Sequence, residues 1–401
     1  MVARTASRTR NLARPDALLR GEETGDGPTV LLLHAGGERR QVWTPVIDVL
    51  TAAGYRCVAY DQRGHGDSDG SRHALAPFAA DAAAMLAEEA PGCVVVGASL
   101  GGLAALAALA DPAVRAKVDG LVLVDVVPDP DADRVRAFLA SGAVLGDFGP
   151  LVEDTLAQAP RLREITAGLD VPILLVRAGV GSSITADEAD RLVRLAPHAT
   201  ATSILDAGHL IARDQPVKLA ETIATAAAEW RALALLRELG AGSVDHPGGN
   251  LLDHLQRVRD LVREWGGSRR LQFVALCHAA YGTDGFPHAL LPLDERDRLQ
   301  AAIGDEAESL VYLYDACDRT KTYARLGETP LPLTDRFTGE VVPLDATDLN
   351  DFVVLTVANE LDVARKASLA PETRRDLRAL VSALAAYAPE AAAQALADPS
   401  L

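Results

Sequence analysis

Short apolar runs rich in valine, isoleucine and leucine recur along the first 210 positions, and stretches with helical spacing separate them. The runs are continuous rather than alternating, which is typical of parallel strands covered by helices on both faces. The sequence therefore predicts an α/β domain with a doubly wound, mostly parallel sheet. The predicted strands are 30–33, 58–61, 93–96, 121–125, 173–176 and 203–206.

After about position 240 the apolar residues recur every three or four positions, which predicts helices. A helix near 215–239 is expected to close the first domain, because glycine-rich segments follow it. Between 335 and 342 a short strand pair interrupts the helical pattern. The expected parts are a flexible basic tail over 1–16, the α/β domain over 17–230 with a small cap inserted near 127–170, and a mainly α-helical domain over 241–401.

Composition narrows the functional classes. The chain has 401 residues and a formal net charge of −17, which argues against nucleic-acid binding because phosphate contacts need clustered lysine and arginine. We expect no membrane-spanning segment, since no apolar stretch reaches 18 residues. The four cysteines form no C-x-x-C pair, so reduced thiols and a cytoplasmic location are expected. A homodimer is left open.

The segment Gly97-Ala98-Ser99-Leu100-Gly101 follows directly on the apolar run 93–96 and precedes an alanine- and leucine-rich helical stretch. A strand that enters G-x-S-x-G and continues into a helix is typical of a nucleophile elbow, in which a strained turn presents the serine at the top of the sheet. The flanking glycines let neighbouring backbone approach closely. The sequence therefore predicts that Ser99 is a nucleophile.

Other motifs follow the predicted strands in a characteristic order. They are His34-Ala35-Gly36-Gly37, the segment from Asp61 to Ser68 with the pattern D-x-R-G-H-G-x-S, and Gly208-His209. Together with the elbow, they resemble the α/β-hydrolase superfamily over residues 17–230. The resemblance implies that His209 is the general base for the serine. It also implies backbone oxyanion donors at Gly36 and Leu100.

The same resemblance implies structural roles for His34 and His65, which correspond to positions that shape two turns. The third member of a triad is less clear. Members of the superfamily usually carry an acid just after the penultimate strand, but no carboxylate follows 173–176 closely. Haloalkane dehalogenases take their acid from the end of the strand after the elbow helix, and Asp125 occupies that position. Asp125 is the favoured acid, with Asp187, or a serine–histidine pair without an acid, as alternatives.

These residues predict a serine hydrolase that acts on a small-molecule ester, thioester or lactone without a cofactor. Perhydrolysis and carbon–carbon bond hydrolysis use the same triad and stay open. Because the usual acid is missing, a degenerate scaffold with a binding or biosynthetic role is a second hypothesis. A third places metal-dependent chemistry in the C-terminal domain.

That C-terminal domain resembles, over roughly 245–370, the HD-domain helical bundle, which usually binds metal through an H…HD…D pattern. His254 and His278 correspond to the two histidines, but Ala279 and Asn359 replace two of the acidic ligands. Two histidines alone are a poor site for a hard cation, so no metal is expected. The preferred interpretation is a degenerate bundle whose histidines belong to the core or to a pocket, and such a pocket could bind a ligand, cover the mouth of the first domain's site or form a dimer surface. The expected residues of this pocket are His254, His278, Tyr281 and Asp284.

Overall fold

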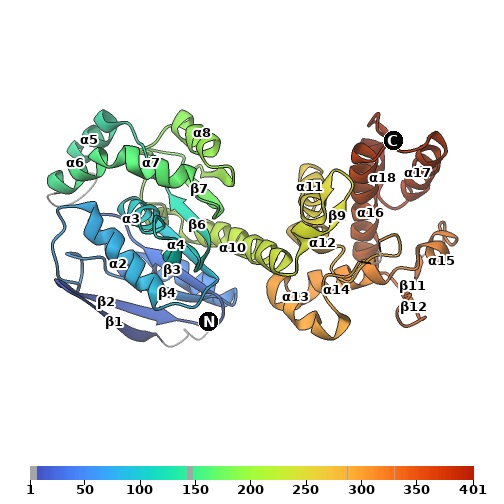
Figure 1. Ribbon diagram of the computed structural model, residues 1–401, viewed down its shortest axis with the longest axis horizontal. Coiled ribbons are helices and arrows are strands. Elements are labelled where there is room, and N and C mark those ends of the chain that lie inside the picture. The colour runs from blue at the N-terminus through green and yellow to red at the C-terminus, as the bar shows by residue number, and fades with distance from the viewer. Residues whose placement is uncertain (1–6, 142–147, 287, 329) are drawn as a thin grey trace. The chain divides into compact units, whose positions relative to one another are not determined.

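The chain divides into two compact units, Met1–Trp230 and Arg231–Leu401, and the division falls within one long helix (Figure 1). The computed structural model describes residues 7–141, 148–286, 288–328 and 330–401.

The first unit is built on an eight-stranded sheet within the described residues. Its strands are β1 (Arg8–Arg14), β2 (Ala17–Thr24), β3 (Thr29–Leu33), β4 (Arg56–Tyr60), β5 (Cys93–Ala98), β6 (Val118–Val124), β7 (Ile173–Ala178) and β8 (Ala199–Ile204). The spatial order is β1-β2-β4-β3-β5-β6-β7-β8, and neighbouring strands from β4 to β8 pair in parallel. The prediction of a mostly parallel sheet is confirmed.

The expected flexible tail is wrong for the residues that the structure describes. Residues 8–14 form β1, which pairs antiparallel with β2, and β2 pairs antiparallel with β4. Ion pairs hold this edge of the sheet: Arg10 contacts Glu23 at 2.9 Å, and Arg14 contacts Asp81 at 2.9 Å. The positive charges that suggested a solvated tail are therefore neutralised by acids of the same unit. Residues 1–6 lie outside the described part.

Helices cover both faces of the sheet, as the continuous apolar runs require. Side chains of β5 alternate between the two layers: Val95 packs in the cluster with α2 and α3, whereas Val94 and Val96 pack in the cluster with α1 and α10. The helices are η1 (Arg40–Trp43), α1 (Thr44–Ala52), α2 (Leu75–Ala87), α3 (Leu100–Ala108), α4 (Pro112–Arg115), α8 (Ala186–Leu195), α9 (Ile211–Asp214) and α10 (Pro216–Glu238).

The cap lies between β6 and β7. In the described residues it consists of α5 (Ala132–Ala140), α6 (Gly149–Ala157) and α7 (Ala159–Ala167). None of the residues of α5 is fully buried, although Val135, Phe138 and Leu139 share one apolar face. The expected insert at 127–170 also contains residues 142–147, which are outside the described part.

The second unit is mainly helical. Its helices are the end of α10, η2 (Ala241–Ser243), α11 (Leu251–Glu264), α12 (Arg269–Cys277), η3 (Leu293–Glu295), α13 (Arg296–Ile303), α14 (Asp305–Ala316), α15 (Arg319–Tyr323), α16 (Ala346–Lys366), α17 (Pro371–Leu384) and α18 (Pro389–Leu396). Two short antiparallel pairs join them: β9 (Asp245–His246) with β10 (Gly249–Asn250), and β11 (Pro332–Thr334) with β12 (Val341–Pro343). The second pair flanks the segment 335–340 instead of running through it.

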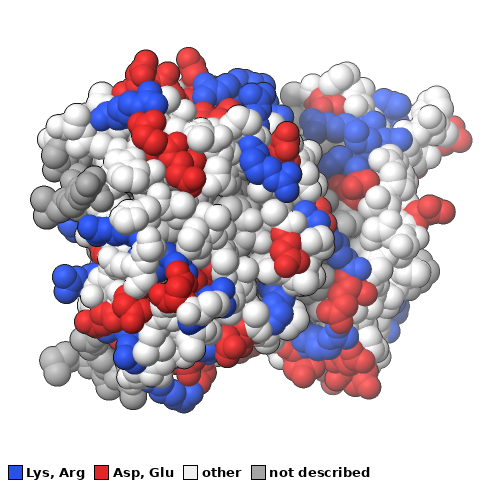
Figure 2. Space-filling model, turned by 60° about the vertical axis from the view of Figure 1, so that its left-hand side comes forward, with Lys and Arg blue, Asp and Glu red and all other residues white. Residues whose placement is uncertain are grey.

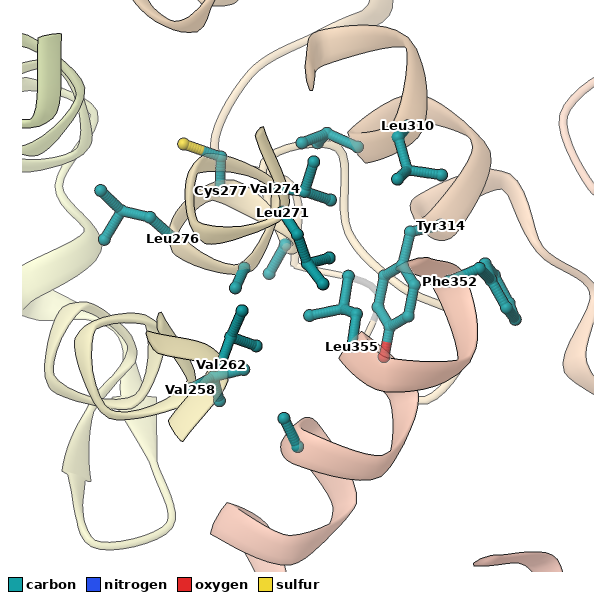
Figure 3. Close-up of a cluster of buried hydrophobic side chains, with 14 of the residues drawn as sticks. Val258, Val262, Leu271, Val274, Leu276, Cys277, Leu310, Tyr314, Phe352 and Leu355 are labelled. Atoms are coloured by element: carbon teal, nitrogen blue, oxygen red, sulfur yellow. The ribbon is translucent and has the colours of Figure 1, made fainter. Parts of the chain in front are cut away.

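One apolar core holds the second unit together, and Figure 3 shows part of it, where side chains of α11, α12, α14 and α16 meet. The labelled side chains include Val258 and Val262 from α11, Leu271 and Val274 from α12, Leu310 and Tyr314 from α14, and Phe352 and Leu355 from α16. This core is separate from the two clusters on either side of the sheet, so each unit has the interior of an independent domain.

Three further observations concern surface and chemistry. On the face shown in Figure 2, basic and acidic side chains are interspersed. All four cysteines are buried and free of disulfides. Among the helices of the described residues, none combines enough length with enough apolar surface to span a bilayer.

The elbow depends on close contact between β5 and α3. A Cβ added to Gly97 would lie 2.4 Å from the Cα and backbone nitrogen of Gly102, and helix backbone cannot move aside as a flexible side chain would. The missing Cβ atoms therefore let strand and helix touch where Ser99 is presented.

Gly97→Ala should accordingly lower the stability of the first unit by roughly 2–3 kcal/mol, as overpacking does. The thermal unfolding midpoint would fall by about 5–10 °C for a unit of this size. Gly168→Ala is the matched control, because its Cβ would meet only carbonyl oxygens at 3.6 Å. Equal midpoints for the two variants would contradict the close-packing argument.

Candidate active site

Ser99 lies at the turn between β5 and α3, in a strained conformation with φ of 47°. Its amide donates to the carbonyl of Val124 at 3.1 Å, and its own carbonyl accepts from the amides of Gly102 and Leu103 at 3.0 and 3.2 Å. The strand and the first turn of the helix thus fix the backbone of Ser99 from both sides. The predicted elbow is present as a local structure.

Asp125 follows β6, and its φ is 49°. Among the described non-glycine residues, Ser99 and Asp125 are the ones with positive φ. Such backbone strain, of order 1–3 kcal/mol per residue, persists only where the surrounding structure enforces it and is concentrated at functional sites. The Asp125 side chain is fully buried, and its amide donates to the carbonyl of Val176 at 2.8 Å.

His209 follows β8 and brings its ring to Asp125. The Nδ1–H group donates to Asp125 Oδ2 at 2.8 Å. With Nδ1 committed to the carboxylate, Nε2 is the nitrogen that remains to exchange a proton. The ring of Phe138, from the cap, lies edge-on to the imidazole with centroids 4.7 Å apart.

The loop after β7 surrounds the same carboxylate with donors. Asp125 Oδ1 accepts from the Ser182 hydroxyl at 2.6 Å and from the Ala178 amide at 2.8 Å. Asp125 Oδ2 also accepts from the Ser183 amide at 3.2 Å. The Ser183 hydroxyl lies 3.2 Å from His209 Nδ1 and donates to the carbonyl of Asp125 at 3.3 Å. Sequence reasoning noticed the absence of an acid in this loop but missed the two hydroxyls that replace it.

These donors outweigh the effect of burial on Asp125. Burial alone would raise the pKa of this carboxyl, but the hydrogen bonds from His209, Ser182 and Ala178 lower it below the usual value. Because the folded-state pKa is the lower one, the ionised cluster stabilises the fold above the unfolded-state pKa of Asp125. That contribution is lost as the pH falls through the folded-state value.

Two backbone amides are candidates for an oxyanion hole. Gly36 follows β3 and Leu100 opens α3, and both residues line the same cavity as Ser99. The structure gives neither amide a hydrogen-bond acceptor within the described residues. The turn at Gly36 is held by His34, which donates through Nδ1 to the carbonyl of Ala35 at 2.8 Å and accepts at Nε2 from the amide of Gln62 at 3.0 Å.

His65 also contacts backbone: its Nδ1 donates to the carbonyl of Arg63 at 2.9 Å. Burial lowers the pKa of His34 to about 4 and also lowers that of His65, so both rings are neutral at pH 7. The side chain of Asp187, the alternative acid, is exposed on the first turn of α8. The structure thus joins His209 to Asp125 by a hydrogen bond and places His209 and Ser99 on the lining of one cavity, and Asp187 belongs to neither arrangement.

A cavity of about 120 Å³ opens beside Ser99 and His209. Its walls come from the sheet end and from the cap helices α5 and α6. In the described part of the chain, none of the lining residues carries a charged side chain apart from the titratable His209. The lining residues are Ala35, Gly36, Ser99, Leu100, Leu103, Val126, Pro130, Val135, Phe138, Leu139, Phe148, Leu151, Val152, Thr155, Leu156, Ser183, Ile184, His209 and Leu210.

In the second unit, His254 from α11 and His278 after α12 face each other as their sequence positions suggested. Their Nε2 atoms lie 3.3 Å apart, and Asn359 Oδ1 lies 3.0 and 3.1 Å from them. His254 Nδ1 donates to Asp362 at 2.7 Å, and His278 Nδ1 donates to the carbonyl of Ala275 at 2.7 Å. With Nδ1 protonated, each neutral ring carries a lone pair at Nε2. An Asn359 side chain turned so that its –NH₂ group faces the rings donates a hydrogen bond to both of these nitrogens.

These residues border a second cavity of about 260 Å³, which Arg319, Glu360 and His246 also line. Of the four residues predicted for this pocket, His254 and His278 line it, but Tyr281 and Asp284 do not. The Tyr281 hydroxyl donates instead to the buried Glu308 at 2.7 Å. Asp284 accepts from the Arg319 amide at 2.9 Å.

The residues at this position do not fit the metal site that the HD-domain resemblance implies. The spacing of the two Nε2 atoms and Asn359 Oδ1 would suit a divalent ion, whose neighbouring ligands lie roughly 3 Å apart. The donors, however, are two imidazoles and an amide, and they bring no negative charge to offset a buried dication. Within the described residues, no group of three or more histidine, cysteine, aspartate and glutamate side chains is arranged to hold a metal ion.

Comparison with protein families agrees with the two-unit division. Residues 28–142 match the family described as alpha/beta hydrolase fold. Residues 235–319 match a family described as Domain of unknown function (DUF6817). The expected HD-like identity of the second domain gains no support from that match. The first unit has a mostly parallel sheet and, at Ser99, the strand–turn–helix that are typical of the α/β-hydrolase fold.

Two of the similar proteins are named as a hydrolase and an esterase. The chain is 41% identical over 130 residues to RutD of Variovorax paradoxus, which is named as a carbamate hydrolase; the match covers 31% of this chain and 48% of the relative. It is 29% identical over 259 residues to an esterase of Mycobacterium tuberculosis, covering 50% of this chain and 82% of the relative. The chain thus spans about half the length of the first of these relatives.

Among solved structures, a thermophilic esterase from Thermogutta terrifontis is 23% identical, with a TM-score of 0.47. That likeness covers 56% of this chain and 99% of the other.

The absence of a carboxylate from the donor set of His254, His278 and Asn359 in the second unit can be tested. Asn359→Asp would complete a set of two histidines and one carboxylate, so the variant should bind about one divalent ion per chain after incubation with Mn²⁺ or Zn²⁺ and desalting. Elemental analysis should find far less in the unsubstituted protein. Asn350→Asp, at an exposed position of the same helix, is the control and should gain nothing. A stoichiometric ion in the unsubstituted protein would contradict our interpretation of the donor set.

Proposed function

We propose that this chain is a serine hydrolase that cleaves a small acyl compound, an ester, thioester or lactone, with Ser99 as nucleophile, His209 as general base and Asp125 as the acid. One observation carries the proposal: the two strained non-glycine residues of the described chain are Ser99 and Asp125, and His209 is hydrogen-bonded to one and lines a cavity with the other. Strain of this kind at two separate turns is expected where a site must be held in a fixed geometry.

In the proposed reaction, the Ser99 oxygen bonds to the acyl carbon while its proton passes to Nε2 of His209. The carbonyl oxygen becomes an oxyanion, which the amides of Gly36 and Leu100 stabilise. The bond from carbon to the alcohol oxygen then breaks, and the imidazolium gives its proton to the departing alcohol. A water molecule repeats these steps on the acyl-enzyme, which releases the acid and restores Ser99.

Asp125 has two tasks in this scheme. Its carboxylate holds Nδ1 protonated, so that Nε2 faces the nucleophile with its lone pair, and its negative charge stabilises the imidazolium that forms during each step. The lowered pKa of Asp125 supports both tasks, because the group stays ionised at neutral pH. The Ser182 hydroxyl and the Ser183 amide support the proposal further, since they donate to the two oxygens of the carboxylate and fix its plane.

The nucleophile is tested by Ser99→Ala. This variant should stay folded, lose labelling by a fluorophosphonate probe and lose p-nitrophenyl butyrate turnover by roughly 10⁴-fold or more. Ser203→Ala, at an exposed position of β8, is the matched control and should label like the unsubstituted protein. Undiminished labelling of Ser99→Ala would rule out the proposed nucleophile.

The acid is tested by Asp125→Asn. The amide preserves the shape of the side chain but removes the charge that orients the imidazole, so kcat should fall about 10²–10⁴-fold. Asp187→Asn should retain the kcat of the unsubstituted protein, because that side chain is exposed on α8. If Asp187→Asn were the impaired variant, the acid would have to come from the loop after β7. If neither variant lost activity, a serine–histidine pair would suffice.

A further inference from the structure

The cavity beside Ser99 differs from the rest of the surface in its chemistry. Apolar side chains of two cap helices face it: Val135, Phe138 and Leu139 from α5, and Leu151 and Val152 from α6. Most of these cap side chains are only partly covered by protein, so the cavity exposes apolar surface that a ligand would remove from water. Cap helices whose apolar side chains are only partly buried by protein are suited to bind an apolar ligand.

The polar side chains of the cavity either take part in the proposed reaction or are hydrogen-bonded within the protein. Ser99 and His209 carry out the proposed chemistry, Ser183 is bonded to Asp125, and the Thr155 hydroxyl donates within its own helix to Leu151 at 2.7 Å. Among the described residues that line this cavity there is no arginine, lysine, aspartate or glutamate. A charged substituent on the substrate would therefore lose its hydration without gaining a partner.

The size of the cavity limits the occupant as well. Its volume of about 120 Å³ is close to the roughly 150 Å³ of an engineered apolar cavity that takes up benzene. Gly36, one of the proposed oxyanion donors, lies beside apolar side chains: a Cβ added at this glycine would lie 3.7 Å from the Phe148 ring and 3.8 Å from the Leu100 side chain. A carbonyl bound there has apolar side chains directly beside its substituent.

We propose that this cavity binds the acyl group of the substrate, and that the preferred substrates are uncharged esters or thioesters whose acyl part is apolar and about the size of a phenyl ring or a six-carbon chain. The inference rests on the proposed function, because it assigns a substrate class to the same site. Phe138 would contact both the acyl group and the ring of His209, since it lines the cavity and lies edge-on to the imidazole.

The test is the kcat/KM of p-nitrophenyl esters that differ only in the acyl group. From acetate through butyrate to hexanoate, kcat/KM should rise by up to roughly four-fold per methylene, the value for burying one CH₂ group. It should then fall for dodecanoate, which exceeds the cavity. The hemisuccinate ester should be roughly 100-fold poorer than the pentanoate ester of equal length, because its carboxylate would be buried without a partner.

A substitution that fills the cavity should change how kcat/KM depends on the length of the acyl group. Val152→Trp puts a large side chain into the α6 wall, so the ratio of kcat/KM for hexanoate to that for acetate should fall at least about ten-fold. Val217→Trp is the matched control, because Val217 lies on the first unit's part of α10 with half of its surface exposed. The control should keep the ratio of the unsubstituted protein.

The outcomes separate this inference from the proposed function. If Ser99 labels and acetate is hydrolysed but the acyl profile is flat, the acyl-group proposal is wrong while the serine hydrolase stands. Equal kcat/KM for the hemisuccinate and pentanoate esters would also overturn it. If Ser99 fails to label and none of the esters is hydrolysed, both proposals are wrong.

Discussion

The buried carboxylate of Asp125, at the end of β6, constrains where the neighbouring strands of the first unit must end. An ionised carboxylate without water costs several kcal/mol unless donors surround it. Asp125 meets this condition through Ala178 at the end of β7, Ser182 and Ser183 in the loop that follows, and His209 after β8. Three consecutive strand ends must therefore reach one point. The parallel sheet supplies this convergence, because the carboxyl ends of its strands share one edge.

Predicting the fold from sequence succeeded where burial on both faces left a continuous apolar run. It failed at the edges of the sheet. Residues 8–14 are mostly charged or polar, with apolar side chains only at Leu12 and Ala13, and form an antiparallel edge strand, so a criterion based on apolar runs could not detect them. The strand β8 (Ala199–Ile204) is exposed along four of its six residues. The only strongly apolar residues near it stand at its end, which placed the predicted strand several residues too late.

In the candidate site, too, some residues could be predicted from the sequence and others could not. Ser99 and its helix are a local motif, and the position of His209 follows from motif order, so both could be expected from sequence. The donors around Asp125 could not, because they depend on which loops meet in space. Tyr281 illustrates the opposite error. Its glycine-rich surroundings suggested a pocket wall, but its hydroxyl is bonded to Glu308, which a helix later in the chain provides.

The hydroxyl of Ser183 shows that the imidazole can be reached from a second loop. It lies 3.2 Å from the same nitrogen that Asp125 holds, in the loop after β7, where the resemblance to the hydrolase superfamily implies an acid. One imidazole is thus within reach of side chains from two strand ends. A lineage could exchange the residue that orients the ring from one loop to the other through an intermediate that carries an acid at both. The catalytic acid of such a fold is tied to a point in space more firmly than to a place in the chain.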